Sequence, residues 1–298
     1  MNGFLNISKP AGMSSAAVVG VLKRLTGVRR IGHAGTLDPE AAGVLPIMLG
    51  RATRLFDYLV DKEKEYVAVC AFGAATDTQD ATGTVIARGE DYPGPERLQA
   101  ELPGLTGEIV QKPSMYSAIK VGGRHLYDLA RRGETAEVPE RTVHVEGIEI
   151  LGEEPDHGWR LRITCGKGTY IRSICDDLGK RCGCPAHMRS LIRTKSGFFT
   201  LEDAVTLVEA RGLAETGELE ARLIPMDAPI QRLRRMDAQD WMAGRVAAGA
   251  ALPLEKMRGE PPEEGGVTRV YLNGEFWGIA ERRGEFLAWR AQIPPRAD

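Results

Sequence analysis

The chain has 298 residues, of which 43% are hydrophobic and 27% are charged, and its formal net charge is −2. These proportions are typical of a globular protein, and the length suits one large domain and one small one. The first residues lack the charged start and long apolar run of a secretory signal, and no stretch approaches the roughly 18 uncharged apolar residues that span a bilayer. Five cysteines, an odd number without framework spacing, indicate reduced thiols, so we expect a cytoplasmic protein.

The chain is predicted to begin with a strand and a capped helix. Residues 4–7 are typical of a short strand. Ser14 or Ser15 caps the helix, whose apolar residues recur at helical spacing, and Gly27 ends it.

A segment rich in helix and strand breakers follows. Residues 32–43 contain too many glycines and prolines for a regular element, and Pro39 keeps Asp38 away from helical backbone angles. Asp38 is therefore expected on a constrained loop, where a rigid scaffold often places chemistry.

Strands and helices alternate through the rest of the large domain. In chain order we expect a helix at 53–59, a strand at 66–72, a turn at 76–83, a helix at 95–103, strands at 143–150 and 159–165, and a helix from 171 to its stop at Gly179. Residues 113–141 interrupt this order as a basic, glycine-rich excursion with a short helical core at 126–130. Beyond residue 225 the segments become short, and the hairpin signal Asn273-Gly274 indicates an all-β terminal module.

Positive charge is concentrated in three blocks along the chain. Residues 1–37 contain five basic side chains and no acid, so Asp38 is the first carboxylate. Residues 111–132 and 178–197 are also strongly basic. Each block alone is more typical of a solvated surface, but together they predict one phosphate-binding face.

The breaker-rich segment carries the most specific motif of the chain. Residues 32–46, with the sequence GHAGTLDPEAAGVLP, closely resemble the catalytic loop of the TruB family of tRNA pseudouridine synthases. The loop departs from the family pattern at Ala34, Glu40 and Ala42, none of which removes a group that the chemistry needs. The resemblance covers nearly all of residues 3–225, and the other blocks that carry it are residues 6–10, 12–15, 64–66, 111–120, 165–172, 183–187 and 191–199.

The resemblance implies an α+β fold with two domains. Residues 1–225 would form a pseudouridine-synthase catalytic domain with a mixed, largely antiparallel central sheet and flanking helices. Its excursion at about 113–141 is similar to the RNA-gripping insertion of the family. Residues 229–298 would form a small all-β domain that is similar to a PUA domain.

The resemblance also implies an activity, the isomerisation of uridine to pseudouridine at position 55 in the T-loop of tRNA. Uracil is detached from the ribose, turned, and rejoined through carbon. Because nothing is oxidised and no group is imported, we expect no cofactor and no metal. A base within folded RNA must be extruded before it can react, so tRNA binding must offset that cost. We expect a monomer that binds the T-arm, without a membrane or an obligate protein partner.

The same resemblance assigns the catalytic roles. Asp38 would be the nucleophile, and Arg172 would pair with it and favour its charged form. Tyr66 would stack on the flipped uridine and help to move the final proton from carbon. Glu40 places a second carboxylate two positions from Asp38, where a like charge opposes ionisation. Whether Asp38 attacks the base or the ribose, or first assists proton abstraction, stays open.

Seven further residues are assigned by resemblance to binding or support. Tyr170 and Leu191 would line the uridine pocket, and His33 would enter the tRNA loop and hold the base extruded. The remaining assignments are support of the active-site loop by Lys9 and Pro10, and phosphate contacts by Lys120 and Arg124.

Three alternatives compete with this interpretation. Cys182, Cys184 and His187, together with Cys175, are ligand types that zinc accepts, although a second paired knuckle is lacking. A tRNA-binding or tRNA-folding chaperone would make catalysis secondary. A guide-RNA-dependent relative of dyskerin would use the same catalytic core, but the chain lacks an obvious lysine-rich tail and has the bacterial type of insertion, which favours a stand-alone enzyme.

Overall fold

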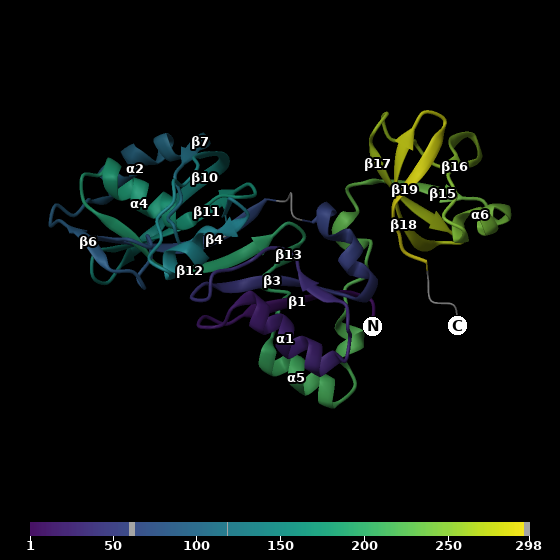
Figure 1. Cartoon of the computed structure of the whole chain (residues 1–298), viewed down its shortest axis with the longest axis horizontal. Helices are drawn as coiled ribbons and strands as arrows, with labels where there is room; N and C mark the ends of the chain where they lie inside the picture. Colours follow the sequence, from purple (N-terminus) through teal and green to yellow (C-terminus); the bar gives the residue numbers. More distant parts are fainter. Residues whose placement is uncertain (60–62, 118, 295–298) are drawn as a thin grey trace.

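The computed structural model describes residues 1–59, 63–117 and 119–294 and contains two main β-sheets, arranged along the long axis of the molecule (Figure 1). Residue 118 of the predicted insertion and residues 295–298 of the predicted terminal domain lie outside the described residues. No helix in the described ranges is both long and apolar enough to cross a membrane.

The larger sheet has ten strands, eight of which run in the order β14-β1-β3-β12-β4-β11-β10-β7. Only two of its strand pairs, β1 with β14 and β3 with β12, are parallel. The predicted mixed and largely antiparallel sheet is therefore confirmed. Its strands are β1 (Gly3–Lys9), β2 (Ile31–His33), β3 (Ala42–Leu49), β4 (Lys64–Phe72), β7 (Gly107–Gln111), β10 (Arg141–Glu154), β11 (Gly158–Cys165), β12 (Ala186–Ser196), β13 (Phe199–Thr200) and β14 (Val205–Thr206).

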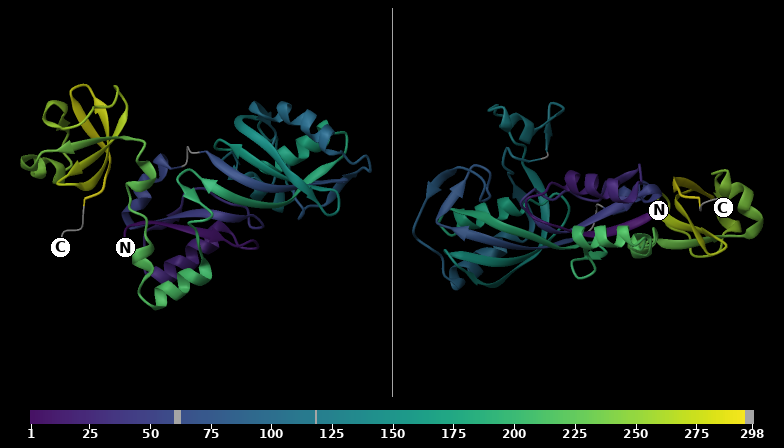
Figure 2. Two further views of the ribbon diagram at one scale, coloured as in Figure 1. Left: turned by 180° about the vertical axis from the view of Figure 1, so that it is seen from behind. Right: turned by 90° about the horizontal axis from the view of Figure 1, so that it is seen from below.

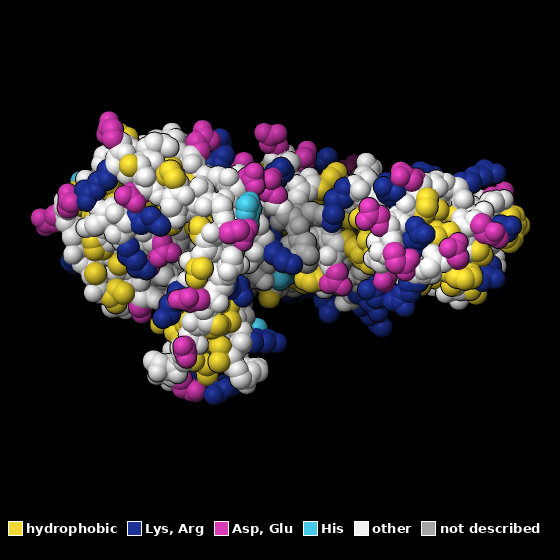
Figure 3. All heavy atoms as spheres, turned by 90° about the horizontal axis from the view of Figure 1, so that it is seen from above, with side chains coloured by type: hydrophobic (Ala, Val, Ile, Leu, Met, Phe, Trp, Pro, Cys, Tyr) yellow, Lys and Arg dark blue, Asp and Glu magenta, His cyan; other side chains and the backbone are white. Residues whose placement is uncertain are grey.

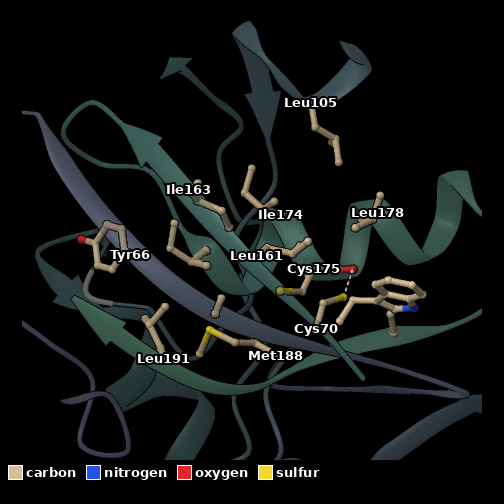
Figure 4. Packing of buried hydrophobic residues seen from close by; sticks show 14 of the residues in the cluster. Tyr66, Cys70, Leu105, Leu161, Ile163, Ile174, Cys175, Leu178, Met188 and Leu191 are labelled. Atoms are coloured by element: carbon tan, nitrogen blue, oxygen red, sulfur yellow. Dashed lines mark hydrogen bonds between the residues drawn. The ribbon is translucent and has the colours of Figure 1, made fainter. Parts of the chain in front are cut away.

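Helices cover this sheet in two groups. Helices α1 (Ser15–Thr26) and α5 (Leu207–Glu215) pack on β1 and β3 around the buried residues Leu5, Leu22 and Leu45. The second group packs on β4, β10, β11 and β12 and consists of α2 (Pro95–Glu101), the 3-10 turn η2 (Leu102–Leu105) and α4 (Ile171–Arg181). Figure 4 shows the core between α4 and these strands, where the Cys70 thiol donates to the Cys175 carbonyl at 3.7 Å.

The ends of α1 follow from their cap residues. The Ser14 side chain accepts a hydrogen bond from the Ala17 amide, and Gly27 adopts the left-handed conformation at φ 66° and donates to the Lys23 carbonyl. These contacts satisfy polar groups that a helix end leaves unpaired. The predicted start and end of this helix are confirmed.

The insertion is a small unit that projects from the body of the molecule (Figure 2, right). It contains β8 (Lys120–Val121), β9 (Arg124–His125) and α3 (Leu126–Arg131). Leu126, Leu129 and Val138 form its own small core.

The C-terminal sheet has five strands in the order β15-β17-β18-β19-β16. Asn273 and Gly274 turn the chain between β17 and β18 with positive φ at both residues, as a two-residue hairpin requires. The predicted β module is confirmed, with a short α-helix and two 3-10 helices added in its described residues. Its elements are β15 (Arg234–Ala238), α6 (Ala243–Ala247), β16 (Leu252–Pro253), β17 (Val267–Leu272), β18 (Glu275–Arg283) and β19 (Phe286–Gln292).

The two sheets share a hydrophobic core. Phe4 and Leu55 of the N-terminal part pack in one cluster with Ile230, Ile279 and Ile293. The division of the chain into independent domains at residues 225–229 stays a prediction.

The remaining elements are β5 (Ala74–Thr76), β6 (Val85–Arg88) and the 3-10 helices η1 (Gly50–Tyr58), η3 (Leu219–Arg222), η4 (Ala228–Ile230), η5 (Asp240–Met242) and η6 (Leu254–Lys256).

Several local predictions are wrong in detail. The helix expected at 53–59 is the 3-10 helix η1, and the helix expected at 95–103 changes to 3-10 geometry after Glu101. Gly179 does not end α4, which continues to Arg181. A Cβ atom at residue 179 would lie 2.6 Å from the Ala186 amide nitrogen, so this glycine allows the helix to approach β12 closely. Strands β3 and β12 were not expected from the apolar pattern.

Candidate active site

Asp38 lies on the loop between β2 and β3, and the side chains of Ser15 and Lys9 hold this loop in place through hydrogen bonds to its backbone. The Ser15 hydroxyl accepts from the Leu37 amide at 2.9 Å and donates to the Leu37 carbonyl at 3.0 Å. The buried Lys9 ammonium donates to the carbonyls of Pro39, Met13 and Pro10 at 2.9, 2.6 and 2.8 Å. Burial lowers the pKa of Lys9, and the negative charges of Glu40 and Asp38 oppose that shift.

Arg193 holds the same loop from the side of the sheet. Its side chain is buried, with only 1% of the residue exposed, and projects from β12. The guanidinium donates to the carbonyls of Val44 at 2.7 Å, Gly35 at 3.1 Å and Thr36 at 3.4 Å. The prediction that this arginine adds to a phosphate-binding surface is wrong, because the guanidinium is buried and hydrogen-bonded to backbone carbonyls.

The other basic residues of the third block pair with acids. Lys180 contacts Asp176 at 2.7 Å, and Lys195 contacts Glu63 at 3.0 Å. Arg181 and Arg189 likewise lie 3.6 and 3.8 Å from Glu101 and Asp156. This block therefore does not present unpaired cations to a phosphate backbone.

The expected ion pair between Asp38 and Arg172 is present. The Arg172 Nε lies 3.1 Å from the Asp38 Oδ2, and the Arg172 side chain is only 6% exposed whereas that of Asp38 is 45% exposed. A second carboxylate, Asp80, lies 3.4 Å from the same guanidinium. The carbonyls of Thr78 and Tyr116 accept further hydrogen bonds from it at 3.1 and 3.0 Å. A buried, fixed cation thus faces a carboxylate that a substrate can reach.

A cavity of about 300 Å³ opens on one side of this ion pair. Asp38, Arg172, Tyr66, Tyr170 and Leu191 all line it, so the structure brings together five of the residues assigned by resemblance. Figure 4 shows Tyr66 and Leu191 side by side at one end of the packed core. Burial raises the pKa of the Tyr66 hydroxyl. The cavity is lined by both aromatic or apolar side chains and charged ones.

Tyr170 is positioned by a residue that the motif assignment passed over. The Gln111 side chain is fully buried. Its amide nitrogen donates to the Tyr170 carbonyl at 3.1 Å, and its amide oxygen accepts from the Tyr170 amide at 3.0 Å. Gln111 therefore fixes the backbone at the start of α4, from which Arg172 projects.

Asp38 and Arg172 also line a second cavity, of about 680 Å³. His33, Glu40, and His125 and Tyr127 of the insertion are among its lining residues. Burial lowers the pKa of His33. The Nδ1 atom of His33 is buried and has no hydrogen-bond partner within the described part of the chain. The insertion therefore forms part of the wall beside the predicted nucleophile.

Other assigned residues lie away from these cavities. Lys120 and Arg124 are on the projecting insertion, and Arg124 forms an exposed ion pair with Glu134 at 3.3 Å. Pro10 is exposed and contributes its carbonyl to Lys9.

The four side chains considered for zinc do not converge. All of the cysteines are buried in free form, and the Nδ1 atom of His187 is hydrogen-bonded to the Ala74 carbonyl at 2.8 Å. Across residues 1–59, 63–117 and 119–294, no three His, Cys, Asp or Glu side chains are grouped as metal ligands would be.

Sequence reasoning missed Asp80, Gln111 and Arg193 as parts of the site. Asp80 was assigned only to a turn, Gln111 lies within a recognised block but was given no role, and Arg193 was assigned only to a basic surface block. Polar residues at inward positions of strands β7 and β12 were the available signal for the last two.

The family comparisons agree with this geometry. Residues 23–171 match the model of the TruB family pseudouridylate synthase N-terminal domain, and residues 172–231 match that of the tRNA pseudouridylate synthase B C-terminal domain. The tRNA pseudouridine synthase B of Geobacillus kaustophilus is 44% identical over 87% of this chain and 95% of its own length. That of Alkaliphilus oremlandii is 39% identical over 96% of this chain and 94% of its own length.

Solved structures extend the likeness to the fold. A Cbf5-Nop10-Gar1 complex contains a chain that matches 94% of this protein, and 78% of that chain, with a TM-score of 0.73 and 27% identity. A chain in the structure of an H/ACA RNP bound to a substrate RNA containing 2′-deoxyuridine matches 98% of this protein over 85% of its own length, with a TM-score of 0.74 and 25% identity. From the two family models and the extent of these matches, the chain belongs to the TruB family of pseudouridylate synthases.

Proposed function

We propose that this protein isomerises uridine to pseudouridine at position 55 in the T-loop of tRNA, with Asp38 as the nucleophile. The observation that carries the proposal is the reachable Asp38 carboxylate, 3.1 Å from a buried guanidinium at the mouth of a cavity lined by Tyr66 and Leu191. Family membership and the names of the relatives supply the substrate class.

The geometry suits an attack by Asp38. A carboxylate nucleophile must be ionised, and a cation at hydrogen-bond distance favours that form. Arg172 supplies this charge from a position that three other acceptors hold fixed. The reaction therefore does not spend free energy on reorganising the charged partner as it proceeds.

The size and walls of the cavity suit a single extruded base. Tyr66 offers an aromatic face, and stacking on such a face offsets part of the cost of extrusion. Tyr170 and Leu191 limit the space around the base. His33, at the edge of the second cavity, would occupy the position that the extruded base leaves in the RNA loop.

The surface suits a tRNA arm. Figure 3 shows the insertion projecting from the body, and Lys and Arg side chains gathering along the same edge of the molecule toward the C-terminal sheet. Lys120 and Arg124 of the insertion would contact phosphates there, which are the groups that dominate nucleic-acid affinity. The protein would act as a cytoplasmic monomer, without a guide RNA, metal, cofactor or obligate protein partner.

The direct test is to incubate the purified protein with unmodified tRNA in the presence of a chelator and to map pseudouridine by chemical sequencing. The wild type should form pseudouridine at position 55, and Asp38→Asn should form none. Glu40→Gln is the matched control, because it removes the neighbouring carboxylate and should retain activity within several-fold. Binding of tRNA without modification by the wild type would instead support the chaperone alternative. Full activity of Asp38→Asn would contradict the assigned nucleophile.

A further inference from the structure

Arg193 is a buried cation without a carboxylate partner in the described part of the chain. Its neighbours are backbone carbonyls rather than acids. Burying a guanidinium in this way is unfavourable unless its charge and its donors are used. Arg193 lines the same cavity as Asp38 and Tyr66, so its charge can act on the groups that react there.

The backbone register places Arg193 directly against Tyr66. Arg193 on β12 pairs with Tyr66 on β4 and with Gly43 on β3. A Cβ atom at residue 43 would collide with the Arg193 backbone carbonyl, so glycine lets β3 and β12 approach closely enough to bring the guanidinium beneath the loop. The position of the side chain is thus fixed by three neighbouring strands.

The donors of Arg193 connect two parts of the site. On one side they bind the carbonyls of Gly35 and Thr36, which lie two and three residues before Asp38. On the other side Arg193 lies directly opposite Tyr66 in the strand pairing, and both residues line the same cavity. One side chain therefore binds the loop of the nucleophile and lies beside the aromatic wall of the base pocket.

The charge of Arg193 also acts on Tyr66. Burial raises the pKa of the Tyr66 hydroxyl, and the neighbouring positive charge of Arg193 opposes that shift. When uracil is rejoined through carbon, the hydrogen on that carbon leaves as a proton. A tyrosine accepts such a proton only as a phenolate, and a neighbouring cation stabilises the phenolate.

We infer that Arg193 is a positioning residue that orients the Tyr66 hydroxyl against the Asp38 loop and stabilises its phenolate form while it accepts the proton from carbon. The inference rests on the proposed function. The phenolate forms by loss of the hydroxyl proton to solvent, and the proton taken from carbon restores the neutral hydroxyl, so Tyr66 returns to its starting state at the end of each cycle. The ring nitrogen released from the ribose takes up one proton from solvent, which balances the one that Tyr66 lost.

The test compares single-turnover rates and tRNA affinity of the wild type, Arg193→Gln and Arg193→Lys. Arg193→Gln removes the charge, and its rate should fall by about 10²-fold, the lower end of what general base catalysis contributes, while the Kd for tRNA stays within several-fold. Because the variant has lost the opposing cation, more alkaline pH should restore part of the rate. Arg193→Lys retains a positive charge and should recover part of the rate at neutral pH.

A double variant separates this role from a structural one. Arg193→Gln combined with Tyr66→Phe should be no slower than Tyr66→Phe alone, since both changes remove the same step. Arg189→Gln is the control on the same strand, where the arginine pairs with Asp156 at the surface. It should match the wild type.

The inference is overturned if Arg193→Gln keeps the wild-type rate, or if its loss is independent of pH and adds to that of Tyr66→Phe. If Arg193→Gln does not fold, a fluorinated tyrosine at position 66 is titrated by fluorine NMR in the wild type and in Arg193→Met, which removes the charge and keeps an apolar side chain in the buried position. A higher midpoint in the variant supports the inference, and an unchanged midpoint overturns it. A wild type that forms no pseudouridine contradicts the proposed function itself.

Discussion

Asp80 controls the orientation of Arg172 rather than the charge of the site. Its Oδ1 accepts from the hydroxyls of Thr78 and Thr82 at 2.8 and 2.6 Å and from the Thr82 amide at 3.0 Å. The Oδ2 atom is then directed at the Arg172 guanidinium, 3.4 Å away. The guanidinium is held between Asp80 and Asp38, so two carboxylates fix its rotation.

Replacing Asp80 with Asn should therefore slow the reaction without preventing RNA binding. The variant keeps the shape of the side chain and loses a charge-assisted hydrogen bond, a contribution of about 1.5–3 kcal/mol, part of which is lost from the transition state. We expect kcat to fall by roughly tenfold or more with KM little changed, since about 1.4 kcal/mol corresponds to a factor of ten. Steady-state kinetics on unmodified tRNA would measure both constants.

The matched control for this experiment is Asp77→Asn. Asp77 lies in the same turn but accepts from the Thr84 amide at 2.8 Å instead of from Arg172. Its replacement should leave kcat unchanged. Equal losses in both variants would mean that the turn as a whole, rather than the contact with Arg172, supports catalysis.

At the scale of single elements, sequence patterns predicted those whose signals are local. Helix α1 follows from its apolar spacing and from its caps Ser14 and Gly27, and the hairpin at Asn273-Gly274 follows from two residues that accept positive φ. The residues around Asp38 were identified by motif. In each case the information lies within a few neighbouring positions.

Strand β12 shows why other elements were missed. Its buried residues are Ala186, Met188, Leu191, Arg193 and Ser196, so the spacing alternates between two and three. Irregularities in the pairing with β4 fall at the two longer steps. Each bulge adds a residue and shifts the inward face, which breaks the period-2 signal of a strand. One inward position is a cation, and only the tertiary structure shows what it binds.

Gly179 provides a prediction at the scale of a helix. Alanine normally stabilises a helix interior relative to glycine, by roughly 0.5–1 kcal/mol. At residue 179, however, an added methyl group would lie 2.6 Å from the Ala186 amide nitrogen and 2.7 Å from its Cβ, and α4 would have to move away from β12. We expect Gly179→Ala to lower the free energy of unfolding by about 1–3 kcal/mol, the usual cost of overpacking.

Gly212 in α5 is the matched control for this prediction. An added methyl group there meets no atom within 4 Å. Gly212→Ala should therefore raise the free energy of unfolding by roughly 0.5–1 kcal/mol. Denaturant unfolding of both variants measures the two changes. Stabilisation by Gly179→Ala would show that α4 does not need its close approach to the sheet.

At the scale of the whole molecule, the two sheets are joined by more than a linker. Ile230 is fully buried in the cluster that contains residues of both parts. Close by, the Tyr271 hydroxyl donates to the Asp227 carboxylate at 2.6 Å, and the Arg269 guanidinium donates to the Gln231 carbonyl at 3.2 Å. Burial raises the pKa of Tyr271 to about 12, so this contact persists throughout the neutral range. The connecting segment is thus anchored to the C-terminal sheet.

This shared core predicts that both sheets unfold together. Ile230→Ala should lower the free energy of unfolding by about 2–5 kcal/mol because it leaves a cavity between the two parts. Tryptophan fluorescence follows the unfolding of each sheet separately. Trp159 belongs to the core of the large sheet, and Trp289 packs against the core of the small sheet. The chain has four tryptophans, so each probe is a variant that keeps a single tryptophan, either Trp159 or Trp289. The unfolding transitions of the two variants should coincide, and Ile230→Ala should shift both equally. Val208→Ala, at an 83% exposed position, is the control and should shift neither transition. A shift confined to Trp289 would mean that the C-terminal sheet unfolds on its own and that the cluster around Ile230 does not couple it to the catalytic sheet.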